Sequence, residues 1–197
     1  MAITEGRNQR NHRLHAAAPT VPAPRVHGEA LPAATATRPV QYVWAAARIA
    51  VGWVFLWAFL DKLFGWGFAT PAAKAWINGG SPTTGFLKGT ADHTFGGLFN
   101  ALAGQAWVDW LFMTGLAGIG TALILGVGMR VAAGAGGLLL LTMWAAELPL
   151  ATNPFMDEHI VYAIVLAGLA LAGAGQTLGL GKWWAATPLV RQLPILK

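Results

Sequence analysis

The chain has 197 residues, no cysteine and a formal net charge of +5, and it is 55% hydrophobic but only 11% charged. Soluble domains carry about 25% charged residues, so this deficit indicates lipid as the main solvent. The lack of cysteine excludes disulfide exchange, thiolate metal sites and cysteine-ligated iron–sulfur clusters within the polypeptide. The basic residues form no patch interleaved with aromatic residues, which argues against nucleic-acid binding.

Residues 1–40 differ from the rest of the chain. They are rich in Ala, Pro, Thr and Arg and contain no apolar run. This composition predicts a disordered basic cytoplasmic tail, neither a signal peptide nor a membrane helix.

Four long apolar segments follow, at about 42–64, 107–127, 131–148 and 159–178. A helix needs about 20 apolar residues to cross a hydrocarbon core of roughly 30 Å. The sequence therefore predicts an all-α integral membrane protein with a four-helix transmembrane domain over 41–184. Residues 185–197 are expected to form a cytoplasmic C-terminal tail.

The connection at 65–106 is too long to be a simple loop. It contains a strong turn signal, Gly79-Gly80-Ser81-Pro82, between short apolar stretches at 72–77 and 95–103. These stretches are too short to span a bilayer. They predict interfacial or re-entrant helices that pack over the outer mouth of the bundle.

Lysines and arginines are unevenly divided between the two sides of the predicted bundle. Both termini, Arg130 and Lys182 share one side, and the other side carries only Lys62, Lys74 and Lys88. Positive residues concentrate on the cytoplasmic side. We therefore expect a multi-pass protein of the bacterial cytoplasmic (inner) membrane, with both termini in the cytoplasm.

Arg48 lies near the start of the first predicted span and has two interpretations. Its side chain reaches the cytoplasmic head groups by snorkelling, or it bonds within the bundle, for example to carbonyls at a helix C-terminus. The sequence leaves both open.

Small residues recur along two predicted spans. Thr114, Gly118, Ala122 and Gly126 fall at every fourth position, and Gly168 and Ala172 repeat the pattern. Such faces let helix backbones approach closely. We expect close packing within one subunit, with a homo-oligomer contact as the alternative.

Acidic residues outside the tail all fall on the predicted outer side: Asp61, Asp92, Asp109, Glu147, Asp157 and Glu158. The deep interior of every span is uncharged. This argues against proton-coupled transport, which needs a titratable residue near the midplane. The spans contain one histidine, His159 at an end, so bis-histidine haem ligation is not expected.

His93, His159, Asp157 and Glu158 have side chains of types that bind metal ions. They show no i,i+3 or i,i+4 pairing. The sequence therefore predicts no metal site and shows no haem or iron–sulfur motif.

The densest polar segment is 153–159, which opens the fourth span. Asn153 is a favoured N-cap and Pro154 suits the first helical position. In the functional interpretation, Asp157 and His159 bind a polar head group or exchange protons with it. The two interpretations are compatible, because capping fixes the backbone while side chains stay available.

Other acidic positions have structural and functional interpretations. Asp61 and Lys62 form a solvated pair at a helix end, or Lys62 holds an anion while Asp61 pairs with another helix. Glu147 is either solvated at the membrane interface or a third functional residue, after the 153–159 segment and the Asp61-Lys62 pair. Asp109 is expected to complement the dipole of the second span.

Several of these residues together resemble the DoxX/DoxD family of four-helix bacterial membrane proteins. The similarity covers about 42–184, and the longer members look like the membrane subunit of thiosulfate:quinone oxidoreductase. It is carried by Arg48, Gly52, Phe55-Leu56, Asp61-Lys62-Leu63, Gly79-Gly80-Ser81-Pro82, Asn153-Pro154-Phe155, Asp157 and His159.

The resemblance implies oxidation of thiosulfate at the outer membrane face, with a membrane quinone as electron acceptor and a second subunit as partner. Within this expectation, our hypothesis divides the roles among residues at the outer side. Catalysis is assigned to Asp157, His159, Glu147 and Asp61, and substrate binding to Lys62, Asn153 and Glu158. The alternative function is a non-catalytic membrane anchor or assembly component of an envelope redox or stress-defence complex.

Overall fold

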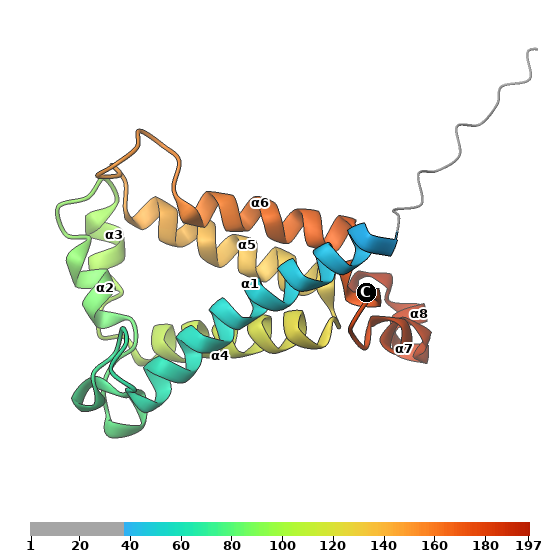
Figure 1. Cartoon of the computed structure of the whole chain (residues 1–197). Helices are drawn as coiled ribbons and strands as arrows, with labels where there is room; N and C mark the ends of the chain where they lie inside the picture. The colour runs from blue at the N-terminus through green and yellow to red at the C-terminus, as the bar shows by residue number, and fades with distance from the viewer. Residues whose placement is uncertain (1–37) are drawn as a thin grey trace, which may run out of the picture. The chain divides into compact units, whose positions relative to one another are not determined.

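The computed structural model describes residues 38–197, so the predicted tail lies outside the described residues except for its last three positions, which begin the first helix. The described chain is helical and has no strand (Figure 1), which confirms the all-α prediction. Its elements are α1 (Arg38–Phe64), η1 (Ala72–Lys74), η2 (Trp76–Asn78), α2 (Thr84–Gly89), α3 (Gly96–Ala101), α4 (Ala106–Leu125), α5 (Met129–Ala146), α6 (Glu158–Leu171), η3 (Ala174–Gln176), α7 (Gly181–Ala186), α8 (Pro188–Gln192) and η4 (Pro194–Leu196).

Three of these helices, α1, α4 and α5, are long and apolar enough to cross a membrane. Their outer faces keep large apolar side chains exposed, for example Val43 of α1 at 67% and Leu141 of α5 at 44%. Contiguous exposed apolar surface of this kind marks a contact with lipid or a partner. The composition and these faces together indicate a membrane protein.

The fourth apolar helix is shorter than the predicted span at 159–178. α6 has 14 residues, which corresponds to about 21 Å at 1.5 Å per residue. It ends because Gly173 adopts a left-handed conformation, with φ of 63°, before the 3-10 turn η3. Residues 38–197 therefore contain three helices of spanning length and a shorter apolar fourth.

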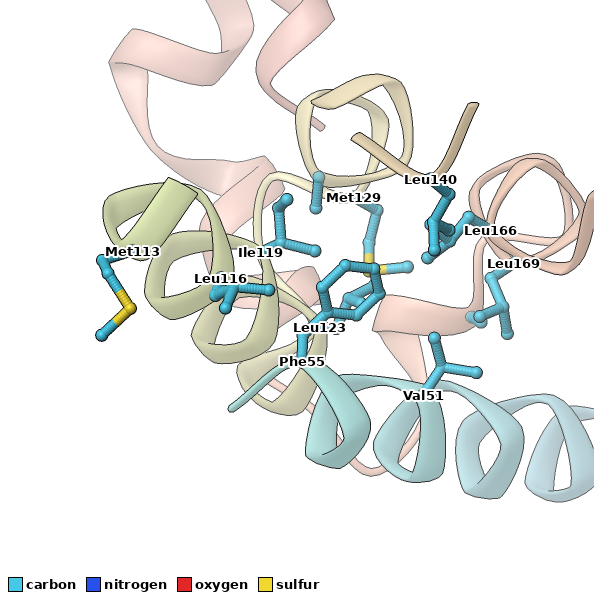
Figure 2. Close-up of a cluster of buried hydrophobic side chains, with 12 residues drawn as sticks. Val51, Phe55, Met113, Leu116, Ile119, Leu123, Met129, Leu140, Leu166 and Leu169 are labelled. Atoms are coloured by element: carbon cyan, nitrogen blue, oxygen red, sulfur yellow. The ribbon is translucent and has the colours of Figure 1, made fainter. Parts of the chain in front are cut away.

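The long helices pack in pairs, α1 with α4 and α5 with α6, and α4 also contacts α5. Figure 1 shows α2 and α3 at one end of this arrangement and α7 and α8 at the other. Side chains from all four helices form the core (Figure 2), in which Phe55 of α1 points towards Ile119 of α4 and Leu166 of α6 lies beside Leu140 of α5.

Close contact between α1 and α4 depends on two glycines outside the predicted small-residue ladder. A Cβ at Gly120 would lie 2.7 Å from the Leu56 nitrogen, and one at Gly52 would lie 2.9 Å from the Leu123 Cβ. In the ladder itself, Thr114 and Gly118 are exposed. Ala122 is partly buried against the core and Gly126 is buried, so the ladder packs within the subunit over its second half only.

Arg48 is fully buried, so it does not snorkel. Its Nη1 donates to the carbonyls of Leu123 and Ile124, the latter at 2.8 Å. Its Nη2 donates to the carbonyls of Thr177 (3.3 Å) and Leu178 (2.8 Å). The last carbonyls of a helix have no partner within the helix and carry its negative dipole end. The interpretation in which Arg48 bonds to carbonyls at a helix C-terminus is confirmed.

Glycines make room for this arrangement. Gly126 caps α4 in the left-handed conformation, with φ of 73°. A Cβ there would lie 2.9 Å from Arg48 Nη1 and 2.8 Å from the Gly175 oxygen. Only glycine combines that conformation with so close an approach.

The segment expected to be a C-terminal tail is folded. η4 lies against the start of α5, where the Arg130 amide donates to the Lys197 carbonyl at 2.8 Å and the Arg130 side chain donates to the Pro194 carbonyl at 3.1 Å. Val190 of α8 is completely buried.

The connection at the other end contains the expected short helix near 95–103, as α3, and α2 in addition. At 72–77 it forms the 3-10 turns η1 and η2. Asp109 of α4 holds this connection, because its Oδ1 accepts from the Thr83 amide (3.1 Å), the Thr83 hydroxyl (2.6 Å) and the Ser81 hydroxyl (2.9 Å). Asp109 thus anchors a loop in addition to occupying the first turn of α4.

Replacing Arg48 by methionine should lower the free energy of unfolding by at least about 2 kcal/mol, because buried carbonyls lose a charged donor. Thermal unfolding in detergent, followed by circular dichroism, measures this loss. Arg38→Met, at the exposed start of the same helix, is the matched control and should stay within about 0.5 kcal/mol of the parent. Equal stability of the two variants would contradict the role given to Arg48.

Gly120→Ala should destabilise the bundle by roughly 1–3 kcal/mol, because the added methyl group meets the backbone of Leu56. Gly118→Ala adds a methyl group that meets nothing within 4 Å. The same unfolding assay should show no loss for this second variant. A reversed order would mean that α4 packs on its predicted ladder face after all.

Candidate functional site

Three of the predicted catalytic residues converge where α5 ends and α6 begins. Glu147 follows the last residue of α5, Asp157 precedes α6, and His159 is its second residue. One ligand atom from each of the three lies within 4.8 Å of the others. We call these residues the Glu147–Asp157–His159 cluster.

Asp157 is fixed by its role as the N-cap of α6. Its Oδ1 accepts from the amides of His159 (3.1 Å) and Ile160 (3.2 Å), two donors that the first turn of a helix leaves unpaired. The prediction of Asn153 as the N-cap and Pro154 as the first helical residue is therefore wrong. Asn153 instead accepts from the Phe155 and Met156 amides in a turn before the helix.

The side chains of Asp157 and His159 form a hydrogen-bonded pair. Asp157 Oδ2 lies 2.8 Å from His159 Nδ1. Partial burial acts to raise the pKa of Asp157, but the bonds from the His159 ring and from the two amides outweigh it, and the pKa lies below its ordinary value. When the ring is neutral and donates to this carboxylate, the proton is on Nδ1 and Nε2 keeps its lone pair.

Glu147 supplies the third polar group. Its side chain makes no hydrogen bond or ion pair within residues 38–197, and it is half-buried. The loop beside it is held in place, because the Trp144 indole donates to the Phe155 carbonyl at 2.9 Å and the Thr94 amide donates to the Leu148 carbonyl at 2.7 Å.

An imidazole and two carboxylates are also a donor set for a divalent cation such as Zn²⁺ or Mn²⁺. The sequence predicted no metal site, because its candidate ligands show no i,i+3 or i,i+4 pairing, and Glu147 was not among those candidates. The convergence depends on the return of the chain from α5 to α6, which residue spacing does not reveal.

Asp61 does not belong to this cluster. It is 2% exposed, and its two oxygens accept from the amides of Phe68 (3.3 Å) and Ala69 (3.0 Å). These bonds close the turn that follows α1. The carboxylate therefore has a structural role that the sequence did not indicate.

Lys62 lines an apolar cavity of about 440 Å³ between α2, α3, α4 and α5. Aromatic side chains form much of its wall, among them Phe86, Phe99, Trp107 and Phe112. Cavities of about 300–1,000 Å³ are typical of small-molecule sites. Sequence reasoning missed these lining residues, because apolar residues on membrane helices carry no signal that separates a cavity wall from a lipid-facing surface.

Glu158, the remaining predicted site residue, is exposed at the first position of α6. Asn153, predicted to bind substrate, is exposed and engaged in its turn. Neither residue is part of the Glu147–Asp157–His159 cluster.

No protein-family profile, curated protein or solved structure matches this chain.

Asp157→Ala should lower the free energy of unfolding at pH 7 by about 1 kcal/mol, the usual effect of losing an N-cap. Because the folded-state pKa of Asp157 is depressed, the charge-dependent part of its stabilisation is complete above the ordinary aspartate value of about 3.9. It is lost as the pH falls through the folded-state value. The stability gap between parent and variant should therefore narrow below about pH 4.

Asp92→Ala, at an exposed acid of the connection, controls for the general loss of a negative charge. Thermal unfolding between pH 3 and pH 7 gives the comparison. A gap for Asp157→Ala that stays constant over this range would contradict the contribution of the ionised cap.

Proposed function

We propose that this chain is the membrane subunit of a quinone-linked oxidoreductase. The observation that carries the proposal is the Glu147–Asp157–His159 cluster, which sets a histidine–carboxylate pair at the end of apolar helices. Quinone reduction needs such groups near the lipid phase, because the quinone takes up two electrons and two protons.

Thiosulfate is the electron donor implied by the resemblance of the sequence. Two thiosulfate ions join through a new sulfur–sulfur bond to give tetrathionate and release two electrons. The quinone accepts these electrons with two protons and becomes quinol, so charge and atoms balance without a further reactant.

Proton transfer to the quinone is assigned to the Glu147–Asp157–His159 cluster. Asp157 holds the His159 ring through Nδ1, so that Nε2 can take up a proton and pass it on. Glu147 shares the same site and can replace the proton. Removing such a relay group typically costs about 100-fold or more in rate.

The cluster is proposed to face the outside of a bacterial inner membrane. Arg130, Lys182, Arg191 and Lys197 lie in the elements at the opposite end, whereas the end with the cluster carries Lys62, Lys74 and Lys88. Positive residues mark the cytoplasmic side. The four apolar helices would then cross the bilayer, with α6 extended by η3 and its flanking residues.

A non-catalytic anchor for a redox partner is the second candidate. It is favoured by an exposed aromatic surface at the end of α1, where Trp57 contacts Trp53, Trp66 and Phe68 at ring-centroid distances of 5.1–5.6 Å. Trp53, Trp66 and Phe68 are at least 50% exposed. Aromatic residues of this kind are enriched in protein interfaces.

Thiosulfate-dependent reduction of decylubiquinone by the purified chain in proteoliposomes tests the proposal. The parent chain should be active, and His159→Ala and Asp157→Asn should each lose about 100-fold in rate. Asp92→Asn, outside the site, should keep the parent rate.

Circular dichroism establishes that each variant is folded. An inactive parent chain would contradict catalysis by this chain alone. Activity that returns with a co-purified partner and survives His159→Ala would favour the anchor.

A further inference from the structure

The cavity beside Lys62 has the character of a site for a lipid-soluble molecule with a polar head. Its walls are apolar and aromatic, and its volume is about 440 Å³. Leu111 of α4 and Leu138 of α5 line the cavity and are 65% and 68% exposed, so the cavity is open at these two residues. A ligand can therefore enter from the hydrocarbon phase.

The polar groups that line the cavity are not equally available. The Thr142 hydroxyl donates to the Leu138 carbonyl at 2.8 Å, and the Thr83 hydroxyl donates to Asp109 at 2.6 Å. Lys62 makes no hydrogen bond within the described part of the chain. The neighbouring Asp61 attracts the ammonium group, but both Asp61 oxygens already accept backbone amides.

An ammonium with unused donors beside an apolar cavity favours a ligand whose head group accepts hydrogen bonds. A quinone carbonyl meets this requirement, and the aromatic walls suit a planar ring. An isoprenoid tail suits the opening between Leu111 and Leu138.

We propose that this cavity is the quinone site, with the quinone head group at Lys62 and the tail leaving between α4 and α5. The inference rests on the proposed function and adds to it a binding site and a head-group anchor. Met143, which lines the far wall of the cavity, lies one helical turn before Glu147 on α5.

Gly115 offers a way to fill the cavity without disturbing the bundle. It lines the cavity, and a Cβ at this position meets nothing within 4 Å. Gly118 on the same helix is equally unobstructed but does not line the cavity. Gly115→Leu and Gly118→Leu are therefore matched variants. The new side chain enters the cavity in Gly115→Leu and stays outside it in Gly118→Leu.

Binding is measured on the full-length chain in detergent with decylubiquinone as the probe, without thiosulfate. Gly115→Leu should abolish binding, Lys62→Met should weaken it at least tenfold, and Gly118→Leu should bind like the parent. A photoreactive azidoquinone should label α4 and α5, and unfolding curves should show all three variants folded.

Binding that withstands both Gly115→Leu and Lys62→Met would overturn the assignment, even if the parent chain reduces quinone. A parent chain that binds palmitate through Lys62 but not decylubiquinone would overturn it as well, and would identify an anionic lipid as the occupant. Lys62-dependent quinone binding without thiosulfate oxidation would support the cavity assignment and contradict the proposed reaction.

Discussion

The buried guanidinium of Arg48 joins three parts of the chain that are far apart in the sequence. It reaches from α1 to the last carbonyls of α4 and to the carbonyls of Thr177 and Leu178 after α6. No carboxylate pairs with it within residues 38–197, so backbone dipoles alone compensate its charge. In a membrane, where water cannot solvate these carbonyls, the contact fixes the end of the bundle that carries α7 and α8.

The opposite end is held by different contacts. Asp109 fixes the connection through Ser81 and Thr83, and a small apolar cluster around Leu87, Phe99 and Ala146 packs α2 and α3 on α4 and α5. The side chains of α4 and α5 leave a space between the two helices near this end. The cavity lies between these two helices and the cap formed by α2 and α3.

The sequence predicted the elements better than their contacts. Apolar runs located α1, α4 and α5 to within a few residues, because hydrophobic length is a local property. The early end of α6 depends on the conformation of Gly173, and the packing face of α4 depends on the approach of α1 at Gly120. Both are tertiary effects that periodicity does not specify.

The same distinction applies to the candidate site. Asp157 and His159 are two residues apart, so their pairing followed from the chain, whereas Glu147 joins them through the fold. Asp61 was expected in the site, yet it closes a turn with amides seven and eight residues away. The cavity had no signature in the sequence, since its walls are ordinary apolar residues of membrane helices.

The most direct test of this account is an electron cryomicroscopy structure of the chain in lipid nanodiscs loaded with quinone. The account predicts a planar head group within hydrogen-bonding distance of Lys62, a tail between Leu111 and Leu138, and Arg48 bonded to the end of α4. A cavity filled by side chains, or a quinone bound elsewhere on the bundle, would contradict it.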